Sequence, residues 1–204
     1  AVPLGAFFQE SSHLLSAVPI AKKQDIIQLT QTQKTAEMLA KDFTNTSDYF
    51  RAIGFTTLTN PSARARKNAL ENGTVQVAEF STSELLSIDW SGLDLIYTPS
   101  FHTVDMHMLL AGQEFFSSLT SQQKAAVNEA LSYMYARAEE YSLLREEMML
   151  SKLQRDGVIL SSLPVGLWEY VEDSTHLIRS YDDDDGIGTL LYERIDDLSK
   201  NLLH

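Results

Sequence analysis

Residues 69–80 read Ala69-Leu-Glu-Asn-Gly-Thr-Val-Gln-Val-Ala-Glu-Phe80. Gly73 stands where a helix that begins near Pro61 would end, because glycine accepts the left-handed backbone that follows many helices. The segment from Val75 to Phe80 is typical of a β-strand. Glu79 falls at the carboxyl end of that strand, which is where open α/β sheets bind ligands. From local sequence alone, however, an exposed acid without a function is the simpler interpretation.

Helices and short strands are expected on both sides of this stretch. Asp48 and Gly54 bracket a short helix as its N-terminal cap and its terminating glycine. We expect helices over residues 24–41, 48–53, 62–72 and 82–87, and strands over 55–58, 75–80, 93–98 and 106–111. Residues 17–20 are expected to be extended.

The strongest local signal is a long helix after residue 120. Thr120 and Gln123 form a capping box, and apolar residues recur every three or four positions until Gly157. A helix over residues 121–156 would be about 54 Å long. This length suggests a spine that joins two lobes or two subunits. A strand over 158–160 and helices over 165–179 and 189–203 are expected to follow.

Composition excludes several classes of protein. The 204 residues carry a formal net charge of −12, which argues against binding to nucleic acid. The absence of cysteine excludes disulfides and thiolate metal sites. No stretch is apolar enough to span a membrane. Residues 1–8 lack the pattern of a signal peptide, as expected for a mature exported protein, a cytosolic protein or a shortened chain.

Motifs of catalysis are missing from the sequence. The five histidines are scattered, and only His102 and His107 come close to the spacing of metal ligands. There is neither a Gly-x-Ser-x-Gly nor a His-Glu-x-x-His pattern. We therefore expect a protein that is not an enzyme. The acidic run at residues 182–185 is more typical of a solvated loop than of a calcium site.

Four segments, in this order, resemble the solute-binding proteins of tripartite ATP-independent periplasmic (TRAP) transporters. They are Phe50-Arg-Ala-Ile-Gly-Phe55, the stretch 69–79, Phe115-Phe-Ser-Ser-Leu-Thr-Ser-Gln-Gln123 with the long helix behind it, and Gly157-Val158. The resemblance implies an α/β fold of the class II periplasmic solute-binding type, with a small mixed sheet, flanking helices and one long spine helix. It also implies that the N-terminal lobe is incomplete.

The resemblance divides the chain into four parts. Residues 1–47 would be a remnant of the N-terminal lobe and a linker, 48–120 the substrate-binding α/β lobe, 121–157 the spine helix and 158–204 a helical C-terminal segment. A chain of this kind is either a fragment, or a version with missing segments, of a longer carboxylate-binding protein, or a reduced relative without a pocket.

Two motifs are most similar to the branch of the family that binds 2-oxo acids and related monocarboxylates. They are Ala78-Glu-Phe80 and Ser100-Phe-His102. The resemblance implies a ligand site formed by Glu79, Phe80, Ser81, Phe101 and His102. It also implies a sodium or calcium ion that bridges to the ligand carboxylate, with Glu79 and Asp105 as candidate ligands of the metal.

The chain departs from that branch at two points. Residues 42–46 contain no arginine where the family carries its carboxylate-binding arginine, and Thr103 stands where the branch has a second acid. The function implied is periplasmic capture of a small 2-oxo or 2-hydroxy carboxylate for a TRAP membrane permease. A homodimer through the long and C-terminal helices is also expected. The alternative is a pocketless module for dimerisation or protein interaction.

Overall fold

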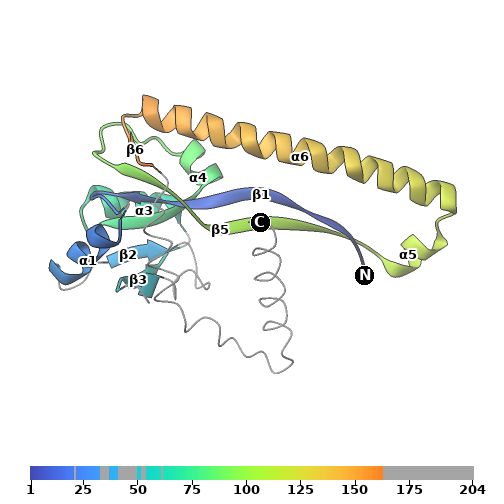
Figure 1. Ribbon diagram of the computed structural model, residues 1–204, viewed down its shortest axis with the longest axis horizontal. Helices are drawn as coiled ribbons and strands as arrows, with labels where there is room; N and C mark the ends of the chain where they lie inside the picture. The colour runs from blue at the N-terminus through green and yellow to red at the C-terminus, as the bar shows by residue number, and fades with distance from the viewer. Residues whose placement is uncertain (21, 33–36, 41–49, 52–53, 61, 163–204) are drawn as a thin grey trace, which may run out of the picture.

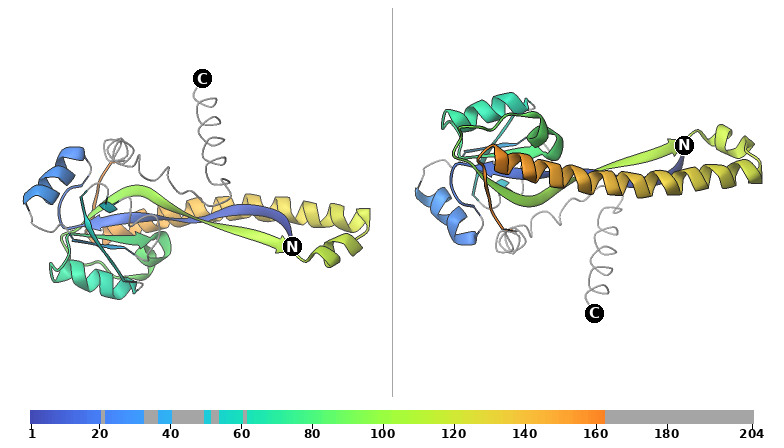
Figure 2. Two further views of the ribbon diagram at one scale, coloured as in Figure 1. Left: turned by 90° about the horizontal axis from the view of Figure 1, so that it is seen from below. Right: turned by 90° about the horizontal axis from the view of Figure 1, so that it is seen from above.

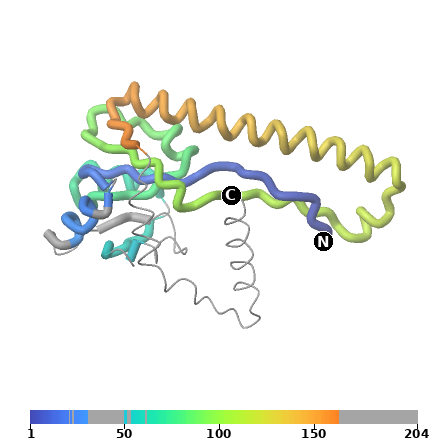
Figure 3. Tube along the Cα trace, viewed as in Figure 1, coloured from blue at the N-terminus to red at the C-terminus, as the bar shows by residue number. Residues whose placement is uncertain are grey.

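A computed structural model describes most of the chain from Ala1 to residue 162. It describes all residues except 21, 33–36, 41–49, 52–53, 61 and 163–204, which Figure 3 draws in grey. The helices expected at 165–179 and 189–203, the acidic run 182–185 and the segment 42–46 therefore lie outside the described residues. Among the described residues, no helix is both long enough and apolar enough to cross a membrane.

One mixed sheet of six strands organises the fold, in the order β3-β2-β4-β1-β5-β6. β1 lies antiparallel to β4 and β5, whereas β2 is parallel to β3 and β4 and β6 is parallel to β5. The strands are β1 (Val2–Ser16), β2 (Glu37–Ala40), β3 (Thr56–Thr59), β4 (Val77–Ser81), β5 (Ile96–Ala111) and β6 (Ile159–Leu160). The small mixed sheet expected from the sequence is confirmed.

Helices cover both faces of this sheet at its compact end (Figure 1). Side chains on a strand alternate between faces. Leu15 accordingly joins a core with Met149 and Leu153 of the long helix, whereas Leu14 joins a second core with Ile26. The helices are α1 (Lys23–Thr32), α3 (Ala63–Glu71), α4 (Thr82–Ser87), α5 (Gln113–Ser118) and α6 (Ser121–Arg155).

The long helix α6 agrees closely with its sequence signals. Thr120 and Gln123 make the reciprocal hydrogen bonds of a capping box, and Asp156 caps the other end before Gly157, whose φ is 90°. α6 begins at the far end of the molecule and ends against the compact part (Figures 1 and 2). The spine helix predicted over residues 121–156 is therefore confirmed to within one residue.

β1 and β5 extend well beyond the other strands and run beside α6 as a two-stranded ribbon (residues 2–9 and 104–111; Figure 1). The Phe7 ring on one face lies 6.2 Å from the ring of Tyr135 on α6. The other face exposes alternate apolar residues of β5. These are Val104, Met106, Met108 and Leu110, each at least half exposed.

Residues 1–47, expected to be a remnant of the N-terminal lobe and a linker, contain β1, α1 and β2, and both strands belong to the sheet. Two expectations for individual elements differ from the structure. The helix expected over 24–41 ends at Thr32, and β2 follows it. The two strands expected at 93–98 and 106–111 are parts of one strand, β5, because Pro99 lies in an irregular segment where a ladder hydrogen bond is not needed.

Candidate ligand-binding site

The residues around the second motif form a wide bulge in β5. Ser12 of β1 pairs with Thr103, and Leu14 pairs with Thr98. Two steps along β1 therefore oppose five steps along β5, and residues 99–102 leave the regular ladder. A bulge re-aims the side chains that it carries, and bulges are frequent beside functional sites.

Phe101 has an unusual backbone within this bulge. Its φ is 48°, and it is the one non-glycine residue with a positive φ in the described part of the chain. For a residue with a Cβ this conformation costs about 1–2 kcal/mol. The side chain remains 45% exposed. The surrounding structure therefore holds Phe101 in a strained position that still faces solvent.

Glu79 and His102 meet beside the bulge. Nε2 of His102 lies 3.3 Å from Oε1 of Glu79, and both side chains are only 3% exposed. The hydroxyl of Ser100 lies 2.6 Å from Nδ1 of His102. The Phe50 ring stands edge-on to the imidazole at 5.2 Å. The structure thus brings together one acid and one imidazole from the two motifs, and the Phe50 ring packs against the imidazole.

Phe80 and Ser81, also expected in the ligand site, have structural roles in the fold. Phe80 is fully buried in the core, 4.9 Å from the Trp90 ring and with the guanidinium of Arg66 5.1 Å from its ring centre. Ser81 caps the N-terminus of α4 through a capping box with Glu84. Strand alternation places the side chain of Phe80 on the sheet face opposite that of Glu79. Phe80 therefore does not line the Glu79 side as the resemblance implied.

The described residues do not fit the expected metal ion. Asp105 pairs with Glu10 on β1, while Glu79 pairs with Leu14. Four residues of strand separate these positions by about 13 Å. Sodium and calcium need several oxygen ligands, and within the described ranges no three His, Cys, Asp or Glu residues gather as a metal site. No step of the function is therefore assigned to a metal.

A separate hollow lies on the outer surface of α6. It has a volume of about 640 Å³ and is open to solvent. Its lining residues in the described part of the chain all belong to α6: Tyr133, Met134, Arg137, Ala138, Glu140, Tyr141 and Leu144. Its described lining presents few convergent polar groups, so the hollow is a poorer ligand site than the bulge.

Sequence reasoning did not find two residues that shape the site. Phe50 covers His102 from a position 52 residues earlier, and His13 of β1 touches the Phe101 ring at 4.8 Å. Both contacts join segments far apart in the chain, so no local sequence pattern predicts them. A prediction of the β1–β5 pairing would have placed His13 next to the bulge.

Comparison with known proteins finds similarity in structure alone. No protein-family model and no curated protein matches the chain. Among solved structures, the ectoine-binding protein of the TeaABC TRAP transporter in its apo state superposes with a TM-score of 0.74 at 15% identity, covering 95% of this chain and 62% of that one. This chain has the fold of a TRAP periplasmic solute-binding protein.

Other TRAP solute-binding proteins superpose with lower TM-scores. The apo open protein of Escherichia fergusonii gives a TM-score of 0.69 at 18% identity, covering 96% of this chain and 61% of its own. The protein of Ochrobactrum anthropi, with its C-terminus in the ligand-binding pocket, gives 0.68 at 17% identity, covering 98% and 62%. The chain therefore spans less than two thirds of each of these proteins.

The similar proteins bind different small organic molecules. The Desulfovibrio salexigens protein contains orotic acid, the Pseudomonas aeruginosa protein L-malate and the Desulfovibrio desulfuricans protein sn-glycerol-3-phosphate. The resemblance to one particular branch, that of the 2-oxo acids, is not decided by these structures. The solved structures with this fold named here are solute-binding proteins of TRAP transporters.

Proposed function

We propose that this chain is the greater part of a periplasmic solute-binding protein that captures a small organic acid for a TRAP membrane permease. The observation that carries the proposal is the buried Glu79–His102 pair beside the bulge of β5, with Phe101 held in a strained conformation. Polar groups and backbone strain that gather at one point of a sheet are typical of a binding site. The fold is the second support.

The chemistry of the pair indicates the class of ligand. Glu79 accepts hydrogen bonds, so it suits a hydroxyl group or another donor of the ligand. The imidazole of His102, turned toward its ligand, suits a carboxylate. A 2-hydroxy acid, or the hydrate or enol of a 2-oxo acid, offers both groups on adjacent carbons. We therefore propose such acids as the first ligands to test. The orotate, malate and glycerol 3-phosphate bound by the similar proteins are further candidates.

Access to the pair requires a change of conformation. Both side chains are 3% exposed, and Phe50 covers the imidazole. The chain also spans only about 62% of the TeaABC binding protein. We infer that the site belongs to a closed cleft, and that a second unit packed on the ribbon of β1 and β5 forms the opposite wall.

A thermal-shift titration tests the proposed function. The panel contains 2-oxo and 2-hydroxy acids, malate, orotate, glycerol 3-phosphate and ectoine, each with and without calcium or sodium. A ligand at a hundred times its dissociation constant adds about 2.7 kcal/mol to the free energy of unfolding. An acid that raises the melting temperature of the wild type, and does so without added cation, is the expected result.

Matched variants locate the effect. Glu79→Gln keeps the size of the side chain but removes its charge, and it is expected to abolish the shift. Glu129→Gln makes the same change at an exposed position of α6 and is expected to keep the shift. A cooperative melt with no shift for any member of the panel would contradict the proposal and favour the pocketless interaction module.

A further inference from the structure

His13 is a buried histidine to which the proposed site gives no role. It lies on β1, an inner strand of the sheet, and its side chain has no exposed surface. Nε2 lies 3.4 Å from Oε2 and 3.5 Å from Oε1 of Glu146 on α6. Nδ1 makes no hydrogen bond to any residue that the structure describes. The side chain is therefore oriented by one carboxylate on the spine helix.

The other side of the imidazole supports the bulge. The Phe101 ring meets the His13 ring edge-on, at 4.8 Å and an interplanar angle of 79°. The Tyr97 ring lies 5.2 Å away on the same strand as Phe101. Because Phe101 is 45% exposed, its own burial is too small to hold a left-handed backbone without help. The contact with His13 supplies part of that help.

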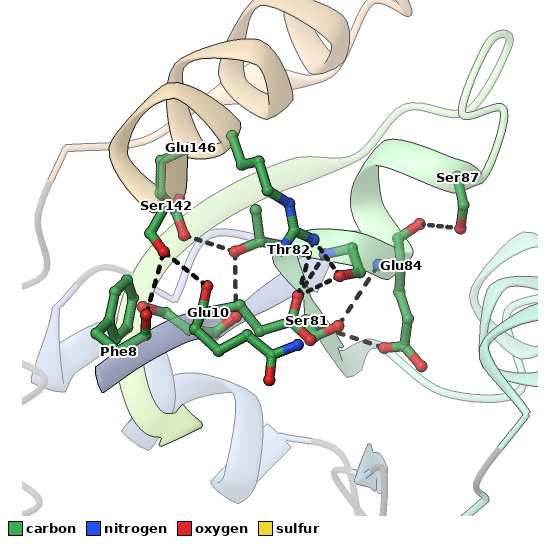
Figure 4. A network of polar contacts seen from close by, with 12 residues as sticks. Phe8, Glu10, Ser81, Thr82, Glu84, Ser87, Ser142 and Glu146 are labelled. Carbon is green, nitrogen blue, oxygen red and sulfur yellow. Dashed lines mark hydrogen bonds and ion pairs between the residues drawn. The ribbon is translucent and has the colours of Figure 1, made fainter. Parts of the chain in front are cut away.

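Glu146 is itself held by neighbours on two elements, His13 of β1 and Thr82 of α4. Its Oε1 lies 2.5 Å from the hydroxyl of Thr82, the first residue of α4, and that hydroxyl also lies 3.2 Å from the carbonyl oxygen of Ser11 on β1. One turn earlier on α6, the Ser142 hydroxyl lies 3.2 Å from the carbonyl oxygen of Phe8. Figure 4 shows Ser142 and Glu146 pointing from α6 toward these partners. α6 is thus fixed to β1 at His13 and, one helical turn away, at Phe8.

We propose that His13 is a positioning residue for the ligand site. It lies between Glu146 on α6 and Phe101 in the bulge of β5, and it holds Phe101 and the neighbouring His102 in the conformation that binds ligand. This role concerns the proposed ligand site and so rests on the proposed function. A core histidine with a purely structural role would stabilise the fold without any local effect on the bulge.

Hydrogen exchange measured by mass spectrometry tests the proposal without a ligand. His13→Phe keeps an aromatic ring but loses the carboxylate contact, and Glu146→Gln removes the charge that orients the imidazole. Both variants are expected to speed amide exchange about tenfold in peptides that cover residues 97–104, the effect of losing one charge-assisted hydrogen bond. Exchange in the core of α3 is expected to stay unchanged. His107→Phe, on the exposed ribbon, is the matched control and is expected to change neither peptide.

Binding affinity is the second measurement that tests the role of His13. With a ligand found by thermal shift, His13→Phe and Glu146→Gln are expected to raise the dissociation constant about tenfold, while His107→Phe leaves it unchanged. If no ligand is found, the proposed function fails, and exchange at residues 97–104 still decides whether His13 positions the bulge. Should His13→Phe not fold, His13→Gln and Glu146→Gln give the same comparison. If the folded His13 and Glu146 variants exchange at residues 97–104 as slowly as the wild type, the inference is overturned.

Discussion

At the scale of single residues, Arg66 shows how a fully buried charge is compensated behind the site. Nε donates to the carbonyl oxygen of Glu79 at 2.9 Å, and Nη1 donates to the carbonyl oxygen of Asn60 at 2.5 Å. Nη2 pairs with the Glu84 carboxylate at 2.6 Å. A buried ion is tolerated only when its donors are satisfied in this way. Arg66 therefore fixes the backbone of Glu79 to α3.

Arg66→Ala is expected to lower the free energy of unfolding by about 3 kcal/mol, because two carbonyl groups and one carboxylate lose their partner. Urea unfolding measures this loss. Arg64→Ala, at an exposed position of the same helix, is the control and is expected to change stability by less than about 0.5 kcal/mol. A loss below about 1 kcal/mol for Arg66→Ala would show that the buried guanidinium contributes little.

Glu10 makes stability depend on pH. Burial alone raises the pKa of Glu10, but hydrogen bonds from Ser83 and the charge of Arg145 outweigh burial and hold the pKa below its usual 4.5. The ionised acid therefore stabilises the fold above the unfolded-state value, and this contribution disappears as pH falls through the lowered pKa. Glu10→Gln is expected to be less stable than wild type near neutral pH, with the difference shrinking in acid. Equal stability of the two proteins at neutral pH would contradict this account.

At the scale of elements, the contact between α6 and the ribbon depends on close approach. A Cβ added to Gly5 would lie 2.0 Å from the hydroxyl oxygen of Tyr135 and 2.6 Å from the ring. The ring therefore lies directly on the backbone of β1. No larger residue fits at position 5 unless the Tyr135 ring moves away.

Gly5→Ala is expected to destabilise the protein by about 1–3 kcal/mol through this overlap. In a Tyr135→Ala background the same change is expected to cost at least about 1 kcal/mol less, because the overlapping ring is gone. Urea unfolding of the four proteins in this double-mutant cycle measures the coupling. Strictly additive effects would mean that the two residues do not touch in solution.

Elements with local signals were predictable from the sequence. The capping boxes at Thr120 and Ser81 and the glycines at positions 73 and 157 fix where α6, α4 and α3 begin or end. β1 was not predicted, since its buried Ser11, Ser12 and His13 break the apolar alternation that marks a strand. These polar residues are acceptable there only because distant segments supply their partners.

The candidate site shows the same limit. Glu79 and His102 were expected from two separate motifs, but their contact was not, because β1 lies between their strands in the sheet. Strand alternation places Phe80 on the face opposite Glu79, whereas the resemblance implied that both residues line one site. The bulge depends on the register of β1 against β5, and a sequence cannot state that register when its two strands lie 80 or more residues apart.

At the scale of the whole molecule, the ribbon is the feature that needs a partner. One face packs on α6, while Met106 and Met108 on the other face are 61% and 64% exposed. A two-stranded ribbon with one uncovered apolar face is a marginal structure in water. This is the surface on which we expect the second unit of the binding protein to pack.

The chain by itself is therefore expected to bind a hydrophobic dye or to self-associate through this face. Met106→Gln with Met108→Gln is expected to reduce dye fluorescence and association while the melting temperature stays within a few degrees of wild type. Tyr133→Gln with Tyr141→Gln, on the outer surface of α6, tests the homodimer expected through the long helix. Light scattering separates the two surfaces, and an unchanged monomer in all three proteins would contradict both.

The most direct test of the central claim is hydrogen exchange of the protein with and without the acid that gives the largest thermal shift. Ligand is expected to protect peptides covering residues 77–81 and 97–103, where Glu79 and the bulge with His102 lie. Peptides that cover only the α6 hollow at residues 133–144 are expected to stay unprotected. Protection confined to those α6 peptides, with none at the bulge, would contradict the assignment of the ligand site.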